Sequence, residues 1–165
     1  PAHWHGLETI MSADASFAFS GAGGGVRYLE YLEPSNTSWT PEYWGGVRFR
    51  GPWNDDEWTN VWAGDLAAGM GWHRRLDAGT SPFVVVGTLG GTLGVESSRP
   101  AHEDGSSGER KTFVQIGLES RGMLRWQPRA APGLSLAAGP ELVVRVPSRL
   151  GWFDPAFVLE GGWRF

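Results

Sequence analysis

Apolar and polar residues alternate along most of this 165-residue chain, and the alternation falls into eight runs. A period of two predicts β-strands with one apolar and one polar face, whereas helical periodicity is nearly absent. In the clearest run, Trp58, Leu66 and Trp72 share one face and Asp65 lies on the other. The runs cover residues 11–20, 26–33, 43–51, 57–73, 82–95, 112–126, 134–146 and 153–165.

Several runs reach 10 to 15 residues, longer than the usual strand of about 5–6. This length suits a tilted strand that crosses a bilayer, which needs about 9–11 residues. Residues 21–25 are GAGGG and are expected to turn the chain between the first two strands. Pro140 would remove a ladder hydrogen bond, so a bulge or a bend is expected there.

The connectors between the runs form two sets that lie at opposite ends of an up-and-down sheet. The longest and most polar connector, residues 96–110, follows an odd-numbered run. Outer-membrane barrels keep their long loops outside, so this set is expected to face outward and both termini to lie in the periplasm. We expect residues 1–9 to be a periplasmic leader and residues 10–165 to form one eight-stranded antiparallel barrel.

The polar face is rich in glycine, alanine and serine, with single charges and almost no lysine. Eight strands leave room only for side chains, so a lumen charge needs a partner. Arginine suits this role because its guanidinium pairs with carboxylates in a planar, bidentate way. Parity places six acids and six arginines inside, so the lumen is expected to be plugged by charge. The acids are Asp14, Glu30, Asp65, Glu119, Glu141 and Glu160, and the arginines are Arg48, Arg50, Arg121, Arg125, Arg145 and Arg164.

The tryptophans near the ends of the runs agree with a membrane wall. Tryptophans at both ends of wall strands make the aromatic girdles of transmembrane barrels. Those expected in the girdles are Trp58, Trp72, Trp126, Trp152 and Trp163. If the first and last strands pair to close the barrel, Arg164 and Asp14 are expected to be neighbours in the lumen.

The last strand, AFVLEGGWRF, alternates and ends on phenylalanine. It resembles the C-terminal assembly signal of bacterial outer-membrane β-barrel proteins, and residues 7–165 resemble the small eight-stranded members of that class. The resemblance implies that the barrel-assembly machinery reads Phe157, Leu159, Trp163 and Phe165. It also implies residence in the outer membrane of a Gram-negative bacterium, in contact with lipids and lipopolysaccharide.

A catalytic site has to be considered because small barrels of this class include lipid-A-modifying enzymes. The resemblance to the deacylase type would require a histidine and a serine closely spaced on a lipid-facing strand. His73 has no serine within two residues, and its parity places it inside. We therefore expect no catalytic, cofactor or metal site, although a hydrolase site involving His73 stays as an alternative.

Cysteine content and net charge narrow the remaining classes of function. The chain has no cysteine, which excludes disulfides and cysteine-ligated metals. A net charge of −4 gives no basic face for nucleic acid. The expected function is a non-enzymatic outer-membrane barrel with a structural or partner-binding role, alone or as a subunit of an envelope assembly. The alternatives are a lipid-A or phospholipid hydrolase, a narrow pore and a soluble lipocalin-like barrel.

Overall fold

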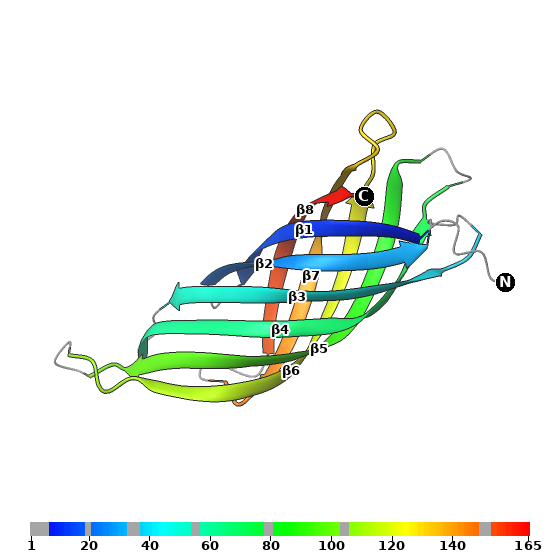
Figure 1. Ribbon diagram of the computed structural model, residues 1–165. Helices are drawn as coiled ribbons and strands as arrows, with labels where there is room; N and C mark the ends of the chain where they lie inside the picture. The colour runs from blue at the N-terminus through cyan, green and yellow to red at the C-terminus, as the bar shows by residue number, and fades with distance from the viewer. Residues whose placement is uncertain are drawn as a thin grey trace.

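The protein is a closed barrel of eight antiparallel strands (Figure 1). It is seen in a computed structural model that describes residues 7–18, 21–32, 37–53, 57–77, 81–102, 106–148 and 153–165, with only the backbone of residues 7–9 and 53. The strands are β1 (Leu7–Ala18), β2 (Gly21–Leu32), β3 (Thr40–Trp53), β4 (Trp58–Arg75), β5 (Phe83–Pro100), β6 (Lys111–Trp126), β7 (Leu134–Val146) and β8 (Phe153–Arg164). The predicted fold class is confirmed.

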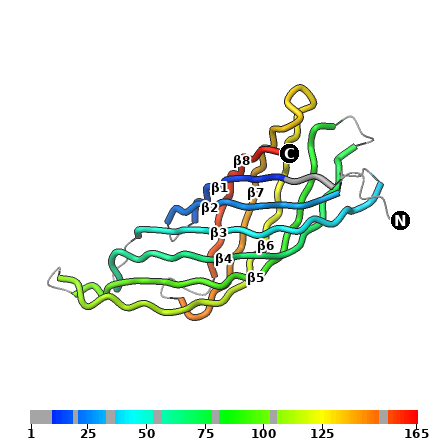
Figure 2. Tube along the Cα trace, in the orientation of Figure 1, coloured from blue at the N-terminus to red at the C-terminus, as the bar shows by residue number. Residues whose placement is uncertain are grey.

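Every strand pairs with its neighbours in the chain, and β1 also pairs with β8 to close the wall. The Cα trace shows near strands crossing far strands at a steep angle, as tilted strands of a small barrel do (Figure 2). The C-terminus lies at the end where the β6–β7 hairpin turns, whereas the β5–β6 hairpin projects from the opposite end (Figure 1). We call these the terminal end and the far end of the barrel. No helix in the described part of the chain is long and apolar enough to cross a membrane.

Strands β1, β2 and β3 each begin three or more residues earlier than the sequence pattern predicts. Residues 21–25 do not turn the chain but form the start of β2, where Gly24 pairs with Ala15 of β1 and with Phe49 of β3. The glycines were misread because a glycine run usually marks a turn, whereas here glycine provides room inside the barrel. Strand β1 begins at Leu7, three residues before the predicted start of the barrel at residue 10, and residues 1–6 lie outside the described part.

A bulge in β4 changes which residues face outward. The register with β5 shifts between Thr59 and Trp62, and Asn60 has a positive φ of 51°. On the N-terminal side of the bulge the alternation is inverted, so Trp58 is half-buried and packs against Val61 and Ala63 inside the barrel. The prediction that Trp58 shares a face with Leu66 and Trp72 was wrong for this reason.

Pro140 does not produce the expected bulge. The register of β7 with β8 is unbroken through the Pro140–Phe157 pair. The register with β6 is the same on either side of Pro140, although Gly139 and Pro140 form no pairs with that strand. The strand thus tolerates the missing N–H by losing local pairs on one side only.

The two faces of the wall are opposite in character to those of a water-soluble barrel. Six aliphatic residues form a continuous row of cross-strand partners from β2 to β7 and are between 39% and 62% exposed on the outside. They are Val26, Val47, Leu66, Leu93, Ile116 and Val146. Small apolar clusters lie inside, one of them formed by Ile10, Leu29, Tyr31, Trp44 and Ala67, but most of the described buried polar side chains are charged.

Candidate functional site: a buried ion-pair network

The lumen holds charged side chains contributed by all eight strands. Strand alternation turns each of these side chains inward, and each is no more than 8% exposed. They are Asp14, Arg27, Glu42, Arg48, Arg50, Asp65, Glu96, Glu119, Arg121, Arg125, Glu141, Arg145 and Glu160. Since an unpaired buried charge is costly, their partners decide whether the barrel is stable.

Arg121 lies at the centre of the network and contacts acids from four strands. Its Nη2 donates to Asp14 Oδ2 at 2.7 Å and its Nε to Glu141 Oε1 at 2.7 Å. The carboxylates of Glu119 and Glu160 lie 3.0 and 3.5 Å from it. One guanidinium therefore joins β1, β6, β7 and β8 across the closure seam.

Two further arginines extend the central cluster to β2 and β3. Arg48 binds Glu141 in a bidentate manner, with distances of 2.8 and 2.7 Å, and also donates to Glu119 at 2.9 Å. Arg27 pairs with Glu119, and its guanidinium carbon lies 4.0 Å from the ring centre of the buried Trp44. Charge-assisted, bidentate pairing and a cation–π contact are among the stronger ways to hold buried arginines.

A second cluster joins four residues near the far end. Arg50 donates to Asp154 at 2.7 Å, and Arg145 donates to Asp65 at 3.0 Å. The crossed pairs, Arg50 with Asp65 and Arg145 with Asp154, are longer at 3.8 and 3.9 Å. Two arginines and two aspartates balance one another here.

The third cluster lies nearer the terminal end around Glu42. Arg125 reaches both carboxylate oxygens of Glu42 at 2.9 and 3.3 Å. His73 is fully buried, with Nδ1 3.1 Å from Glu42 Oε2 and Nε2 3.0 Å from the Leu32 carbonyl oxygen. Tyr31 packs edge-on against His73 and accepts a hydrogen bond from Gln127. Both imidazole nitrogens of His73 thus have structural partners.

Glycines make the room for these side chains. Many of the long inward charges have a glycine as cross-strand partner, and a Cβ on that glycine would collide with backbone or with the charged side chain. The pairs are Gly23–Arg50, Gly25–Arg48, Gly46–Arg27, Gly71–Glu42, Gly90–Glu119, Gly94–Asp65 and Gly117–Arg145. This arrangement gives a physical reason for many of the 25 glycines in the chain.

The structure places most of the predicted lumen residues together, with two exceptions. Glu30 faces outward, where it accepts a hydrogen bond from Tyr28 at 2.6 Å. Arg164 has inward parity but is half-buried at the strand end. The other ten, including Asp14, Asp65, Glu119, Arg121, Glu141, Arg145 and Glu160, are buried inside.

The predicted contact between Asp14 and Arg164 was wrong in register. Asp14 pairs with Glu160, whereas Arg164 pairs with Ile10, four residues away along β1. Sequence parity gives the face of a residue and not its offset along the neighbouring strand, so it could not supply this register.

Sequence reasoning missed the buried charges Arg27, Glu42 and Glu96. Arg27 and Glu30 have opposite parity in β2, and only one of them can face inward. The apolar side chains of Val26 and Leu32 share the face of Glu30 and could have shown which one. Glu42 and Glu96 were read as connector residues because the predicted strands were too short.

The tryptophans predicted for the aromatic girdles do not all lie on the outer face. Trp72 and Trp163 are exposed on the outside, Trp126 is half-buried at the end of β6, and Trp58 is turned inward by the bulge. Trp152 lies outside the described residues. Trp39 and Trp62, which were not assigned to a girdle, are exposed.

The residues of the proposed assembly signal all lie on the outer face. Phe157, Leu159, Trp163 and Phe165 are between 49% and 76% exposed. Strand β8, which carries the first three, pairs with both β1 and β7. The terminal strand is therefore hydrogen-bonded on both edges while its apolar side chains point away from the lumen.

No group of three or more His, Asp or Glu side chains suited to a metal ion occurs among the described residues. His102 is exposed, whereas the acidic residues 55–56 and 103–104 and the histidines at positions 3 and 5 lie outside the described ranges.

Comparison with solved structures places this geometry among known barrels. A major outer membrane protein of Thermus thermophilus superimposes with a TM-score of 0.64 at 15% identity, over 98% of this chain and all of that one. Ail, the attachment invasion locus protein of Yersinia pestis, gives 0.57 at 15% identity, over 96% and 97%. The N-terminal β-barrel domain of OprF from Pseudomonas aeruginosa gives 0.56 at 12% identity, over the same shares.

The fold is that of the small eight-stranded outer-membrane barrels. Ail has also been solved in complex with the heparin analogue sucrose octasulfate, and that structure matches with a TM-score of 0.53 at 17% identity, over 96% of this chain and 97% of that one. No protein-family model and no curated protein sequence matches the chain. The likeness is thus one of fold, carried by topology and not by sequence identity.

Proposed function

We propose that the chain is a non-enzymatic integral outer-membrane barrel with a structural or partner-binding role in the envelope. The observation that carries this proposal is the polarity of the wall, which is aliphatic outside and charged inside. A water-soluble barrel would place the aliphatic row inward, because apolar surface is removed from water on folding. Hydrocarbon lipid is the solvent that suits the observed outer face.

The positions of the outward charges support a membrane-spanning band. Among strand residues with described side chains, the outward charges are Glu30, Arg74 and Arg99, and each lies within two residues of its strand end. Trp62 and Trp72 bracket an apolar face of β4 and lie ten residue steps apart. At a rise of about 3.3 Å per residue and a tilt of about 40°, this face is about 25 Å tall, which matches the apolar band of outer-membrane barrels.

We further propose that the lumen is closed to ions. The three clusters extend over much of the barrel length, and seven lumen charges are joined in the central cluster alone. Breaking such pairs to admit an ion would leave buried charges without partners. The pairing favours a structural plug over a channel.

The environment of His73 supports a non-enzymatic role. Its ring is fully buried in the lumen and hydrogen-bonded at both nitrogens, and the partners at those nitrogens are a carboxylate and a carbonyl oxygen instead of a nucleophile. A lipid hydrolase needs its base to reach a lipid-facing nucleophile.

The proposal is tested by membrane fractionation with gel mobility before and after boiling. We expect the protein in the outer-membrane fraction, with an unheated form that migrates faster than the boiled form. Pure protein in planar bilayers should give no steady conductance. Recovery in a soluble fraction would overturn the membrane assignment, and a steady conductance would overturn the closed lumen.

A second candidate function is binding of an anionic polysaccharide at the far end. Arg99, Arg110 and Lys111 are exposed close together on the β5–β6 hairpin, next to the described acids Glu57 and Glu109. The complex of Ail with a heparin analogue shows that a barrel of this fold binds a sulfated sugar. Replacing the three cations with glutamine should abolish retention on immobilised heparin, whereas Arg74→Gln, at the terminal end, should not change it. Equal retention of all three proteins would exclude this function.

A further inference from the structure

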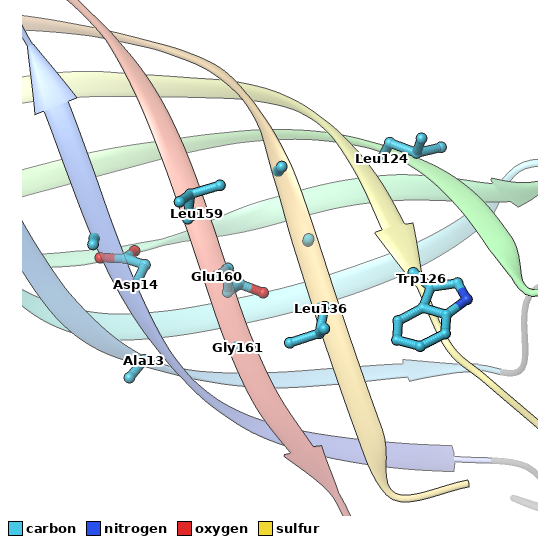
Figure 3. A pocket seen from close by; sticks show the side chains of 11 residues that line it. Ala13, Asp14, Leu124, Trp126, Leu136, Leu159, Glu160 and Gly161 are labelled. Atoms are coloured by element: carbon cyan, nitrogen blue, oxygen red, sulfur yellow. The ribbon is translucent and has the colours of Figure 1, made fainter. Parts of the chain in front are cut away.

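A groove of about 630 Å³ crosses the outer wall of the barrel over β1, β8, β7 and β6 (Figure 3). Its floor is made of small outward-facing residues, Ala13, Ala138 and Gly161, and its sides of Leu136 and Leu159. A second depression of the outer wall, of about 510 Å³, lies beside Trp39, Trp72 and Leu89, and the groove over β8 is the larger of these two.

The groove runs toward the terminal end of the barrel. Trp126, the last residue of β6, lines it there, and Leu136 is flanked in register by Trp126 on one side and Gly161 on the other. A little further along, Trp163 pairs with Leu134. Indole rings sit at the level of lipid headgroups, so the groove begins at one membrane interface and continues into the hydrocarbon.

The charge beyond this interface is positive. Arg129 is exposed in the β6–β7 hairpin, three residues after Trp126, whereas Arg164, at the end of β8, is half-buried and has inward parity. An apolar groove that opens next to an exposed arginine matches an amphiphile with an acyl chain and a phosphate headgroup. Because the termini are proposed to face the periplasm, this amphiphile belongs to the periplasmic leaflet.

We propose that the groove binds one acyl chain of an anionic phospholipid, with its phosphate at Arg129 on the terminal rim. The binding would be a specific contact of one lipid, distinct from the exchanging lipid that covers the remaining wall. The inference rests on the proposed membrane location, since Leu124, Leu136 and Leu159, which line the groove, are exposed on the outside of the barrel.

The test uses the full chain refolded in detergent, with limiting palmitoyl-oleoyl phosphatidylglycerol added and the retained lipid counted by native mass spectrometry. Gly161→Leu and Ala13→Leu fill the groove from two strands. A Cβ at Gly161 meets Leu136 at 3.6 Å, an ordinary contact, so the first variant should fold. Gly91→Leu is the matched control, since Gly91 is exposed on β5 and its Cβ would have no neighbour nearer than 4.0 Å.

We expect the fraction of protein that retains one lipid to fall at least fivefold in both groove variants and to stay at the wild-type value in Gly91→Leu. Equal retention in all folded proteins would overturn the inference. If the wild type forms dimers and the groove variants do not, the groove binds a second copy of the chain. If the protein retains lipid A in preference to phosphatidylglycerol, the ligand belongs to the other leaflet. Both results would overturn it. Failure of the proposed function would appear separately, as wild-type protein that does not enter membranes.

Discussion

Each inward-facing arginine of β2 and β3 lies opposite a glycine of the neighbouring strand. In a lumen only wide enough for side chains, the missing Cβ is the space through which a guanidinium crosses to acids on the far wall. Arg48, for example, passes Gly25 to reach Glu141. Glycine and arginine therefore act as a pair, and changing either should be costly.

Gly117→Ala should lower the free energy of unfolding by about 1–3 kcal/mol, the usual cost of overpacking. Its Cβ would press on the Val144 carbonyl oxygen and lie 2.7 Å from Thr92 Oγ1. The control is Gly122→Ala in the same strand, where a Cβ has no neighbour within 4 Å, and it should stay within about 0.5 kcal/mol of the wild type. Urea unfolding in lipid vesicles measures both values, and equal stability of the two variants would contradict the role of glycine.

Arg121→Met should destabilise the barrel more strongly, by about 3–5 kcal/mol, because it leaves buried carboxylates without their shared partner. The same unfolding experiment on Arg110→Met gives the control, since Arg110 is exposed in the far-end hairpin. A variant lacking Arg121 that unfolds at the wild-type urea concentration would show that the central cluster does not stabilise the fold.

Single elements contain the irregularities that alternation alone does not show. The bulge of β4 places one extra residue at Asn60, and the Asn60 side chain accepts a hydrogen bond from Trp62 Nε1 at 2.7 Å. The bulge turns Trp58 inward and leaves Trp62 outside as the aromatic residue at that end of the strand. A one-residue shift of this kind reverses the face of every residue beyond it.

Asn60→Val should cost about 1–3 kcal/mol, because a β-branched residue is strained at a φ of 51°. Asn60→Gly keeps the backbone conformation accessible and removes the side chain that bonds Trp62, so it should be milder. Thermal unfolding in detergent ranks the two variants. A glycine variant as unstable as the valine variant would place the effect in the side-chain hydrogen bond and not in the backbone.

Strand β8 gives a prediction about biogenesis. Phe165→Ala should reduce the amount of protein in the outer membrane severalfold, because the resemblance assigns Phe165 to the signal that the assembly machinery reads. Phe165 is 76% exposed, so the variant should refold from urea into lipid vesicles as well as the wild type does. Impaired refolding in vitro would show that Phe165 acts in folding and not in recognition.

At the scale of the whole molecule, length and alternation were enough to predict eight strands, closure and a charged interior. They could not give the partners inside, because pairs such as Arg48 with Glu141 are 93 residues apart and depend on the stagger of the closed sheet. Glu30 was assigned to the wrong face because β2 carries charges of both parities. Trp58 was assigned to the wrong face because the bulge in β4 reverses the alternation. The groove was also invisible, since it is formed by small residues of β1, β7 and β8 that meet only after closure.

The central claim is that the aliphatic outer face contacts lipid. Because the chain has no cysteine, a single Leu66→Cys carries one nitroxide label at the middle of the outward row, and Arg99→Cys carries one near the far end as the control. In bilayers, the label at residue 66 should be accessible to oxygen and shielded from a water-soluble nickel chelate, and the label at residue 99 should show the reverse. Equal accessibility of both labels to the nickel chelate would contradict the account.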